Sequence, residues 1–286
     1  MTSHSFFSRL TLVGDYVLDS PLHIGNGPDG VATDAEDRPL IPGSTFRGAL
    51  RAYIESVLRG VETDQHTTRQ SVTLRGSDGR PVTNTRVVRL ACDSTDKRDD
   101  DLQYQGCLTR AIVTRWESDP VLRPKLDSAL ADCTCQICRL FGAPWLAGRV
   151  HIADLVARDW KGSLLRRGGL AISRDRDVMI EGSSYQREAV PPGTSFGFQL
   201  VAENVTPVEQ GMILLGLRAF EAGLIALGGD RARGLGYGHL AIDWWNCRYV
   251  DADHLISTLL GNDPQIFTDS EAETRIDALA AVLRNP

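Results

Sequence analysis

The chain has 286 residues, of which 42% are hydrophobic and 24% are charged, the composition of a soluble globular protein with one large domain or two small ones. No apolar stretch approaches the roughly 18–20 residues that span a bilayer, and the N-terminus lacks the order of a signal peptide, so we expect a cytoplasmic protein with no membrane partner. The net charge of −6 argues against a generic polyanion binder, because phosphate contacts require local positive potential.

A strand and a helix are predicted in the first sixty residues. Residues 8–18 alternate polar and apolar side chains, as a half-buried strand does, and a loop rich in glycine and proline follows. The helix is predicted within residues 40–60, with Ser44 or Thr45 as its N-cap. One face of this helix would carry apolar side chains: Phe46, Leu50, Ile54, Val57 and Leu58.

The middle of the chain carries weaker patterns. Residues 60–106 are polar and show no sustained periodicity, so we interpret them as an inserted or flexible segment. A helical pattern over residues 107–131 is interrupted by Pro120 and Pro124. Residues 149–160 alternate as a strand does.

The second half predicts a long hairpin, a helix and a closing strand. The hairpin arms would be residues 169–174 and 194–203, the helix would lie within residues 209–227, and the strand would begin at residue 241. The last residues, 251–286, are rich in acidic side chains. The order of these elements predicts an α+β fold compatible with a ferredoxin-like, RNA-recognition-type core.

Three cysteines lie within six positions, at Cys133, Cys135 and Cys138, which is the crowding of a metal site. Zinc favours four tetrahedral ligands from cysteine or histidine, so a fourth ligand must come from elsewhere. Cys107 is the first choice, and Cys92 and His66 are the alternatives. We expect a structural Zn²⁺ ion, because four protein ligands would leave no position for water.

Two further segments combine glycines with arginines. Residues 228–238 follow a helix and precede a strand, so they are not the phosphate loop of a dinucleotide-binding fold. Their glycines would still let a backbone approach a phosphodiester, although a simple turn is the alternative. At residues 41–51, a helix start with Ser44 could meet a phosphate between Arg47 and Arg51; an ordinary capped helix is the alternative.

Taken together and in this order, these segments resemble the repeat-associated mysterious protein (RAMP) superfamily, specifically the backbone subunit of type III CRISPR effector complexes. The resemblance spans residues 22–242 and rests on these segments: LHIGNG, RPLIPGSTFRGALR, CTCQICRLFG, YQREAVPPGTSFGF and LGGDRARGLGYGHL. It implies a single modified ferredoxin-like domain over residues 1–250. Residues 60–140 would be an insertion with the zinc site, residues 165–200 a protruding thumb hairpin, and residues 251–286 an acidic C-terminal segment.

The resemblance also implies a role in binding RNA. The expected partners are CRISPR RNA, target RNA, further copies or paralogues of the same fold, and other type III effector subunits. The apolar tip of the thumb would displace a base pair, or contact a neighbouring subunit. The implied RNA-binding residues are Gly43, Ser44, Arg47, Arg51, Val178, Met179, Ile180, Gly228, Gly229, Arg231, Arg233 and Gly234.

In the family that the chain resembles, an aspartate after the HIG motif cuts paired target RNA with a divalent metal. The loop here offers Asp29, Asp34 and Asp37. Asp34 resembles the second, non-catalytic acidic position, which leaves Asp29 as the catalytic candidate with Mg²⁺ or Mn²⁺. A turn aspartate that bonds its own backbone is the alternative.

The resemblance thus implies a metal-dependent endoribonuclease that acts within a complex. Two other interpretations stay open: a purely architectural guide-RNA-binding subunit with an inactive site, and a CRISPR RNA-processing endoribonuclease. Processing would need a histidine or basic cluster near the glycine-rich segment, where His239 is the local candidate. For His23, at the end of the first strand, we expect a packed or hydrogen-bonded side chain.

Overall fold

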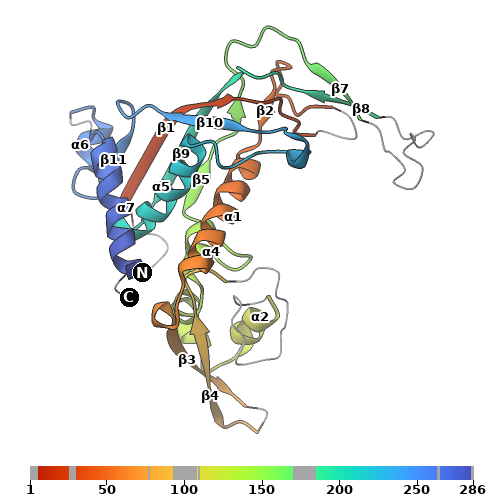
Figure 1. Ribbon diagram of the computed structural model, residues 1–286. Helices are drawn as coiled ribbons and strands as arrows, with labels where there is room; N and C mark the ends of the chain where they lie inside the picture. The colour runs from red at the N-terminus through yellow and green to blue at the C-terminus, as the bar shows by residue number, and fades with distance from the viewer. Residues whose placement is uncertain are drawn as a thin grey trace, which may run out of the picture.

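An antiparallel sheet of five strands forms the centre of the molecule (Figure 1). The computed structural model describes residues 6–25, 30–76, 78–92, 108, 110–169, 185–262 and 265–284. The strand order is β10 (Gly238–Ile242), β1 (Ser8–Leu18), β9 (Ser195–Glu203) and β5 (Val150–Ile152), and every neighbouring pair is antiparallel. A further strand, β11 (Arg248–Asp251), pairs with the first residues of β1 and continues the line of β10.

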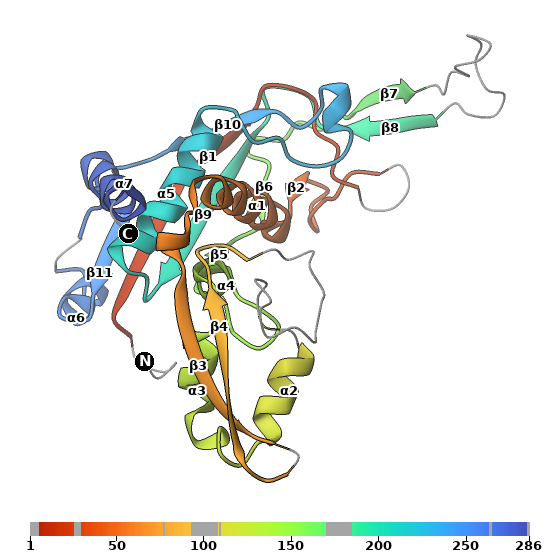
Figure 2. The same ribbon diagram turned by 60° about the horizontal axis from the view of Figure 1, so that its bottom comes forward.

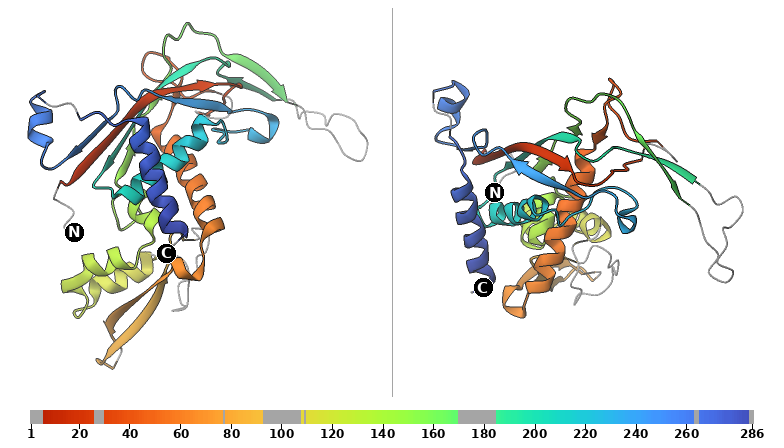
Figure 3. Two further views of the ribbon diagram at one scale, coloured as in Figure 1. Left: turned by 60° about the vertical axis from the view of Figure 1, so that its left-hand side comes forward. Right: turned by 45° about the horizontal axis from the view of Figure 1, so that its top comes forward.

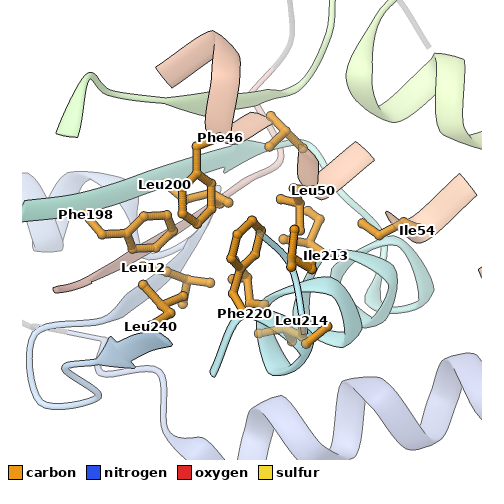
Figure 4. Close-up of a cluster of buried hydrophobic side chains, with 14 of the residues drawn as sticks. Leu12, Phe46, Leu50, Ile54, Phe198, Leu200, Ile213, Leu214, Phe220 and Leu240 are labelled. Carbon is orange, nitrogen blue, oxygen red and sulfur yellow. The ribbon is translucent and has the colours of Figure 1, made fainter. Parts of the chain in front are cut away.

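Two helices cover one face of this sheet, as Figure 3 shows: α1 (Gly43–Val61) and α5 (Pro207–Glu221). Alternate side chains of β1 point toward them, so that Leu10, Leu12 and Tyr16 are fully buried. Figure 4 shows the aromatic centre of this core, where the rings of Phe46 and Phe220 stack with centroids 4.1 Å apart. The strand predicted for residues 8–18 and the helix predicted within residues 40–60 are therefore confirmed.

The start of α1 differs from the prediction. Its N-cap residue is Pro42, and no side chain caps the helix from that position, so the assignment of Ser44 or Thr45 was wrong. The N–H group of Gly43 instead donates to Asp154 Oδ1 at 2.7 Å. A Cβ atom on Gly43 would lie 2.1 Å from the carbonyl oxygen of Ile152, so glycine permits this close contact with β5.

The segment predicted to be an insertion, residues 60–140, contains a hairpin that the sequence did not predict, formed by β3 (Thr68–Arg75) and β4 (Pro81–Val88). Figure 2 shows it beside α2 (Arg110–Ser118), α3 (Leu126–Asp132) and α4 (Gln136–Phe141). A second hydrophobic cluster joins β3, α2 and α3 through Val72, Leu74, Val113, Trp116 and Leu130. Only two side chains of β3 are buried, and its outer face carries hydroxyl pairs such as Ser71 with Thr85, so the strand pattern is weak.

A protruding hairpin leaves the sheet, and residues 170–174 of its predicted first arm lie outside the described residues. The described part consists of β7 (Leu165–Gly169) and β8 (Tyr185–Ala189), which pair with each other and project away from the sheet (Figures 1 and 2). The predicted second arm, residues 194–203, is β9 of the central sheet, because it pairs with β1 and β5. The short strands β2 (Leu40–Ile41) and β6 (Leu155–Val156) form a separate pair.

The last residues contribute α6 (Leu255–Leu259) and α7 (Asp269–Arg284). Helix α7 packs closely on α5, since a Cβ atom on Gly211 would lie 2.3 Å from the carbonyl oxygen of Arg275. In the part of the chain that the structure describes, none of the helices has the length and apolar character needed to cross a membrane.

Candidate functional site

Three buried cysteines form the group best suited to hold a metal ion: Cys92, Cys135 and Cys138. Their Sγ atoms all lie within 4.8 Å of one another, and those of Cys92 and Cys138 are 3.6 Å apart. Tetrahedral zinc with Zn–S bonds of about 2.3 Å requires sulfurs about 3.8 Å apart. The donor set and its spacing therefore fit a thiolate-bound zinc ion.

Two of these cysteines flank the first turn of α4. Cys135 is the N-cap of this helix, and its Sγ accepts a hydrogen bond from the backbone N–H of Cys138 at 3.4 Å. The C-x₂-C spacing thus places both sulfurs on one side of a tight turn, an arrangement common to structural zinc sites.

Cys92 reaches the group from the insertion, after β4. The N–H of Leu90 donates to Glu62 Oε1 at 2.8 Å, and the N–H of Ile137 donates to the carbonyl oxygen of Leu90 at 3.2 Å. The backbone that carries Cys92 is thereby held between the end of α1 and the start of α4.

The structure corrects the predicted ligand set. Cys133 is not in the group: it ends α3 and packs in the second hydrophobic cluster, where burial raises its pKa to about 11 and favours the neutral thiol. Cys92, an alternative for the fourth ligand, takes its place. His66 is also outside the group and contacts Thr63 and the carbonyl oxygen of Leu283. Cys107 lies outside the described residues, within which the group has three members.

The two arginines of α1 that were predicted to flank a phosphate make contacts within the chain. The Arg47 guanidinium donates to the carbonyl oxygens of Val150 and Phe141. Arg51 donates to Glu55 Oε1 at 2.8 Å, to the carbonyl oxygen of Gly142 at 3.0 Å and to Cys138 Sγ at 3.2 Å. Both side chains therefore tie α1 to the segment that carries the cysteines.

Burial acts to lower the pKa of both arginines, but the net shifts have opposite directions. Burial lowers the pKa of Arg47, with a further contribution from the charge of Arg51. Burial also acts to lower the pKa of Arg51, but the hydrogen bond to Glu55 and the charge of Cys138 outweigh it, so the pKa is raised. Ser44 is exposed on the first turn of the same helix.

The glycine-rich segment lies against the loop that follows β1. Gly228 has a φ of +75°, and a Cβ atom there would lie 2.3 Å from the carbonyl oxygen of His23. The N–H of Gly229 donates to the same oxygen at 3.0 Å. His23 is itself buried, with Nδ1 2.7 Å from the carbonyl oxygen of Glu188, so its packed role is confirmed. These glycines permit close contact between two loops of the chain.

Arginines surround this glycine contact. Asp230 forms ion pairs with Arg187 of β8 and with Arg233, the latter at 2.9 Å. Arg231 is exposed, and no described residue pairs with it. Arg167 lies opposite Arg187 in the hairpin, and the neighbouring Arg166 is 3.7 Å from Glu188. We call this group the basic surface; it comprises Arg166, Arg167, Arg187, Arg231 and Arg233.

A family model of the RAMP superfamily matches residues 15–239. The chain belongs to the RAMP superfamily. A search of curated proteins gave no match. The region matched in this RAMP chain runs from β1 to β10 and includes both the cysteine group and the basic surface.

The outer face of the RAMP sheet has no Phe, Tyr or Trp at the outward positions of β1, β9 and β10. In β1 this face carries Thr11, Val13, Asp15 and Val17, and in β10 it carries His239, which lies opposite Val17. Proteins stack RNA bases on aromatic side chains, histidine included. On these three strands, His239 is therefore the side chain on which a base could stack.

The acidic loop is described only in part. Asp29 and the thumb tip of Val178, Met179 and Ile180 lie outside the described residues. Asp34 closes a turn: its Oδ1 accepts the N–H groups of Glu36 and Arg38, and its Oδ2 accepts Arg38 Nε at 2.8 Å. Partial desolvation acts to raise the pKa of Asp34, but the Arg38 hydrogen bonds outweigh it and hold the pKa below its usual value.

Two other features of this RAMP chain bear on its chemistry. His239, the candidate for RNA processing, pairs with Asp19 at 2.9 Å on the surface. A shallow groove of about 660 Å³, which sequence reasoning missed, is lined in part by Arg38, Arg158 and Trp160. Arg38 is far in sequence from Arg158 and Trp160, so no local motif predicts the groove.

Proposed function

We propose that the chain is a CRISPR RNA-binding backbone subunit of a type III interference complex. Membership of the RAMP superfamily suggests a CRISPR-associated RNA-binding function, and RAMP proteins bind CRISPR RNA within multisubunit complexes. The connectivity supports the proposal, because a strand order of β10-β1-β9-β5 with helices after β1 and β9 matches a β-α-β-β-α-β core of the ferredoxin-like type.

The observation that carries the proposal is the basic surface. It brings five arginines together in a chain whose net charge is −6, and Asp230 and Glu188 pair with members of this group. Arg166 and Arg233 have side chains 75% and 60% exposed, so they can contact phosphates without desolvation of a buried charge. The RNA backbone would therefore follow the base of the β7–β8 hairpin and the glycine-rich segment.

Cleavage of guide-paired target RNA is a further part of the proposal. Asp29 is the candidate, with Mg²⁺ or Mn²⁺ as the metal. The described ends of its loop, Gly25 and Val31, pair with each other, and His23 just before them contacts Gly228 beside the basic surface. In contrast, the carboxylate of Asp34 is engaged by Arg38, which makes Asp34 the weaker candidate.

A structural zinc ion completes the proposal. Cys92, Cys135 and Cys138 would hold it, with Cys107 as the first choice for the fourth ligand. Such an ion would cross-link the insertion to the segment around α4 and take no part in the reaction with RNA.

Equilibrium binding of single-stranded guide RNA tests the role of the basic surface. An R167A/R231A variant should bind roughly tenfold more weakly, equivalent to about 1.4 kcal/mol. Its salt dependence should flatten by about 1.4 in log–log slope, because each lost phosphate contact removes about 0.7. The control R80A/R123A changes the net charge equally on the insertion. Equal affinities of both variants for RNA would contradict the proposal.

Cleavage is tested separately in the assembled complex with Mg²⁺ and a guide-complementary RNA. Loss of cutting in Asp29→Ala, with guide binding and cutting by Asp34→Ala retained, is the expected result. Unchanged cutting by Asp29→Ala would move the nuclease elsewhere. No cutting by the unaltered complex would leave the architectural role alone.

A further inference from the structure

Arg51 donates a hydrogen bond to the cysteine group and is not itself a candidate metal ligand. Its NH2 nitrogen lies 3.2 Å from Cys138 Sγ, while Nε and NH1 are held by Glu55 and by the carbonyl oxygen of Gly142. Three directions of the planar guanidinium are thus fixed by α1 and by the end of α4. The N–H that points at sulfur is oriented by these other contacts.

A buried thiolate site needs such a partner. Three thiolates and Zn²⁺ carry a net charge of −1 before any fourth ligand is counted, and Cys92, Cys135 and Cys138 are each at most 4% exposed. Burial of uncompensated charge is costly, so a fixed cation at one sulfur stabilises the metal-bound form. Groups that hydrogen-bond to metal ligands typically change metal affinity 10- to 100-fold.

We infer that Arg51 is a positioning residue of the metal site: its guanidinium orients Cys138 and offsets the charge of the thiolates around a bound Zn²⁺ ion. The inference rests on the zinc site of the proposed function. It reassigns a residue that the sequence placed at an RNA phosphate to the metal site, and it links α1 to the cysteine group. Lysine would not replace it, because a single ammonium cannot reach three partners in one plane.

Cobalt substitution in the full chain tests the inference. Co²⁺ in a thiolate site gives a charge-transfer absorption band whose energy depends on how strongly the sulfurs donate electrons. In Arg51→Met, the lost N–H donor should leave Cys138 more electron-rich and move the band to lower energy. Chelator competition should show Zn²⁺ affinity reduced about 10- to 100-fold. Arg51→Lys should behave like Arg51→Met, and it supplies the answer if the methionine variant does not fold.

Arg59→Ala is the matched control, because Arg59 also binds Glu55, at 3.4 Å, and has no hydrogen bond to the cysteine group. Its cobalt spectrum and Zn²⁺ affinity should equal those of the unaltered chain. An unshifted band with unchanged affinity in both Arg51 variants would overturn the inference and leave the zinc site standing. Failure of the unaltered chain to bind Co²⁺ or Zn²⁺ would overturn the metal site itself, whereas RNA binding would be judged by its own experiment.

Discussion

The arginines of this chain show that residue type alone does not assign a role. Arg47 and Arg51 lie in the motif that resembles a phosphate-binding helix start, yet their guanidinium groups donate to carbonyl oxygens and a cysteine sulfur. Arg231 and Arg233 lie in the other predicted segment and are exposed. Exposure and the partners already present therefore decide which arginines are available to RNA.

The glycines of the glycine-rich segment differ in how closely other atoms approach them. Gly228 is the one whose substitution should destabilise the fold. Its φ is +75°, and a Cβ atom would meet the carbonyl oxygen of His23 at 2.3 Å. Gly228→Ala should destabilise the fold by about 3 kcal/mol, from left-handed strain plus displacement of a backbone. Thermal unfolding measures this loss.

Gly234 is the matched control for Gly228. Its φ is +79°, but a Cβ atom added there would have no neighbouring atom within 4 Å, so Gly234→Ala should cost only about 1 kcal/mol. Equal melting temperatures for the two variants would show that the His23 contact does not constrain this loop.

The members of the cysteine group were predictable in part. The C-x₂-C pair follows from local spacing, so Cys135 and Cys138 were found. Cys92 is 46 positions from Cys138 and reaches it only because the β3–β4 hairpin returns the chain to α4. Cys133 is nearer in sequence but belongs to another helix end, and no local pattern separates it from a ligand.

At the scale of elements, α5 is stabilised by a buried ion pair that should make the fold sensitive to acid. Glu209 belongs to a capping box with Thr206 and binds Arg149 at 3.1 Å. Burial acts to raise the pKa of Glu209, but the Arg149 and Thr206 hydrogen bonds outweigh it and hold the pKa below 4.5. Its stabilisation is therefore present above about pH 4.5 and is lost as the pH falls through the lowered pKa.

Glu209→Gln should thus lower the free energy of unfolding by about 2 kcal/mol at pH 7, with a smaller difference near pH 3. Denaturant titrations at the two pH values measure it. Glu203→Gln is the control, because Glu203 pairs with Arg9 at the surface and such pairs contribute little. A difference for Glu209→Gln that persists unchanged at pH 3 would contradict the assignment.

Element prediction succeeded where the periodicity was local. In β1, α1 and α5, the buried side chains recur within one continuous stretch of sequence, so each element can be predicted from its own residues. The partner of a strand is not local: residues 194–203 were predicted correctly as a strand but assigned to the hairpin, whereas β9 pairs with β1 and β5. The polar β3–β4 hairpin has too few buried side chains to give a pattern.

For the whole molecule, the cysteine group lies where the insertion meets the main core. Cys92, Cys135 and Cys138 pack in the main hydrophobic cluster, while Cys133 packs in the cluster of the insertion. Removal of a bound metal by a chelator should therefore lower the melting temperature by several degrees, through loss of binding to the folded state. Differential scanning calorimetry with and without chelator measures this shift.

Cys135→Ser should abolish the chelator effect and melt at a reduced temperature. Cys247→Ser is the control: Cys247 is buried too, but it donates to the carbonyl oxygen of Asp243, away from the group. Its melting temperature should keep its dependence on the chelator. If the chelator did not change the melting temperature of the unaltered chain, a structural role of the metal would be contradicted.

The β7–β8 hairpin should contribute to RNA binding but little to the stability of the whole molecule. Among the described residues, β7 and β8 pair only with each other, and Arg166 lies opposite Glu188, so residues 167–187 can be replaced by a two-residue Asn-Gly turn. The shortened chain should melt within about 4 °C of the original, since the central sheet keeps its pairs. Its guide-RNA affinity should fall more than tenfold, because Arg167 and Arg187 are lost.

Shortening the insertion hairpin in the same way, with residues 73–83 replaced, should leave RNA affinity unchanged. Equal RNA affinity in the two shortened chains would place the RNA elsewhere than at the basic surface.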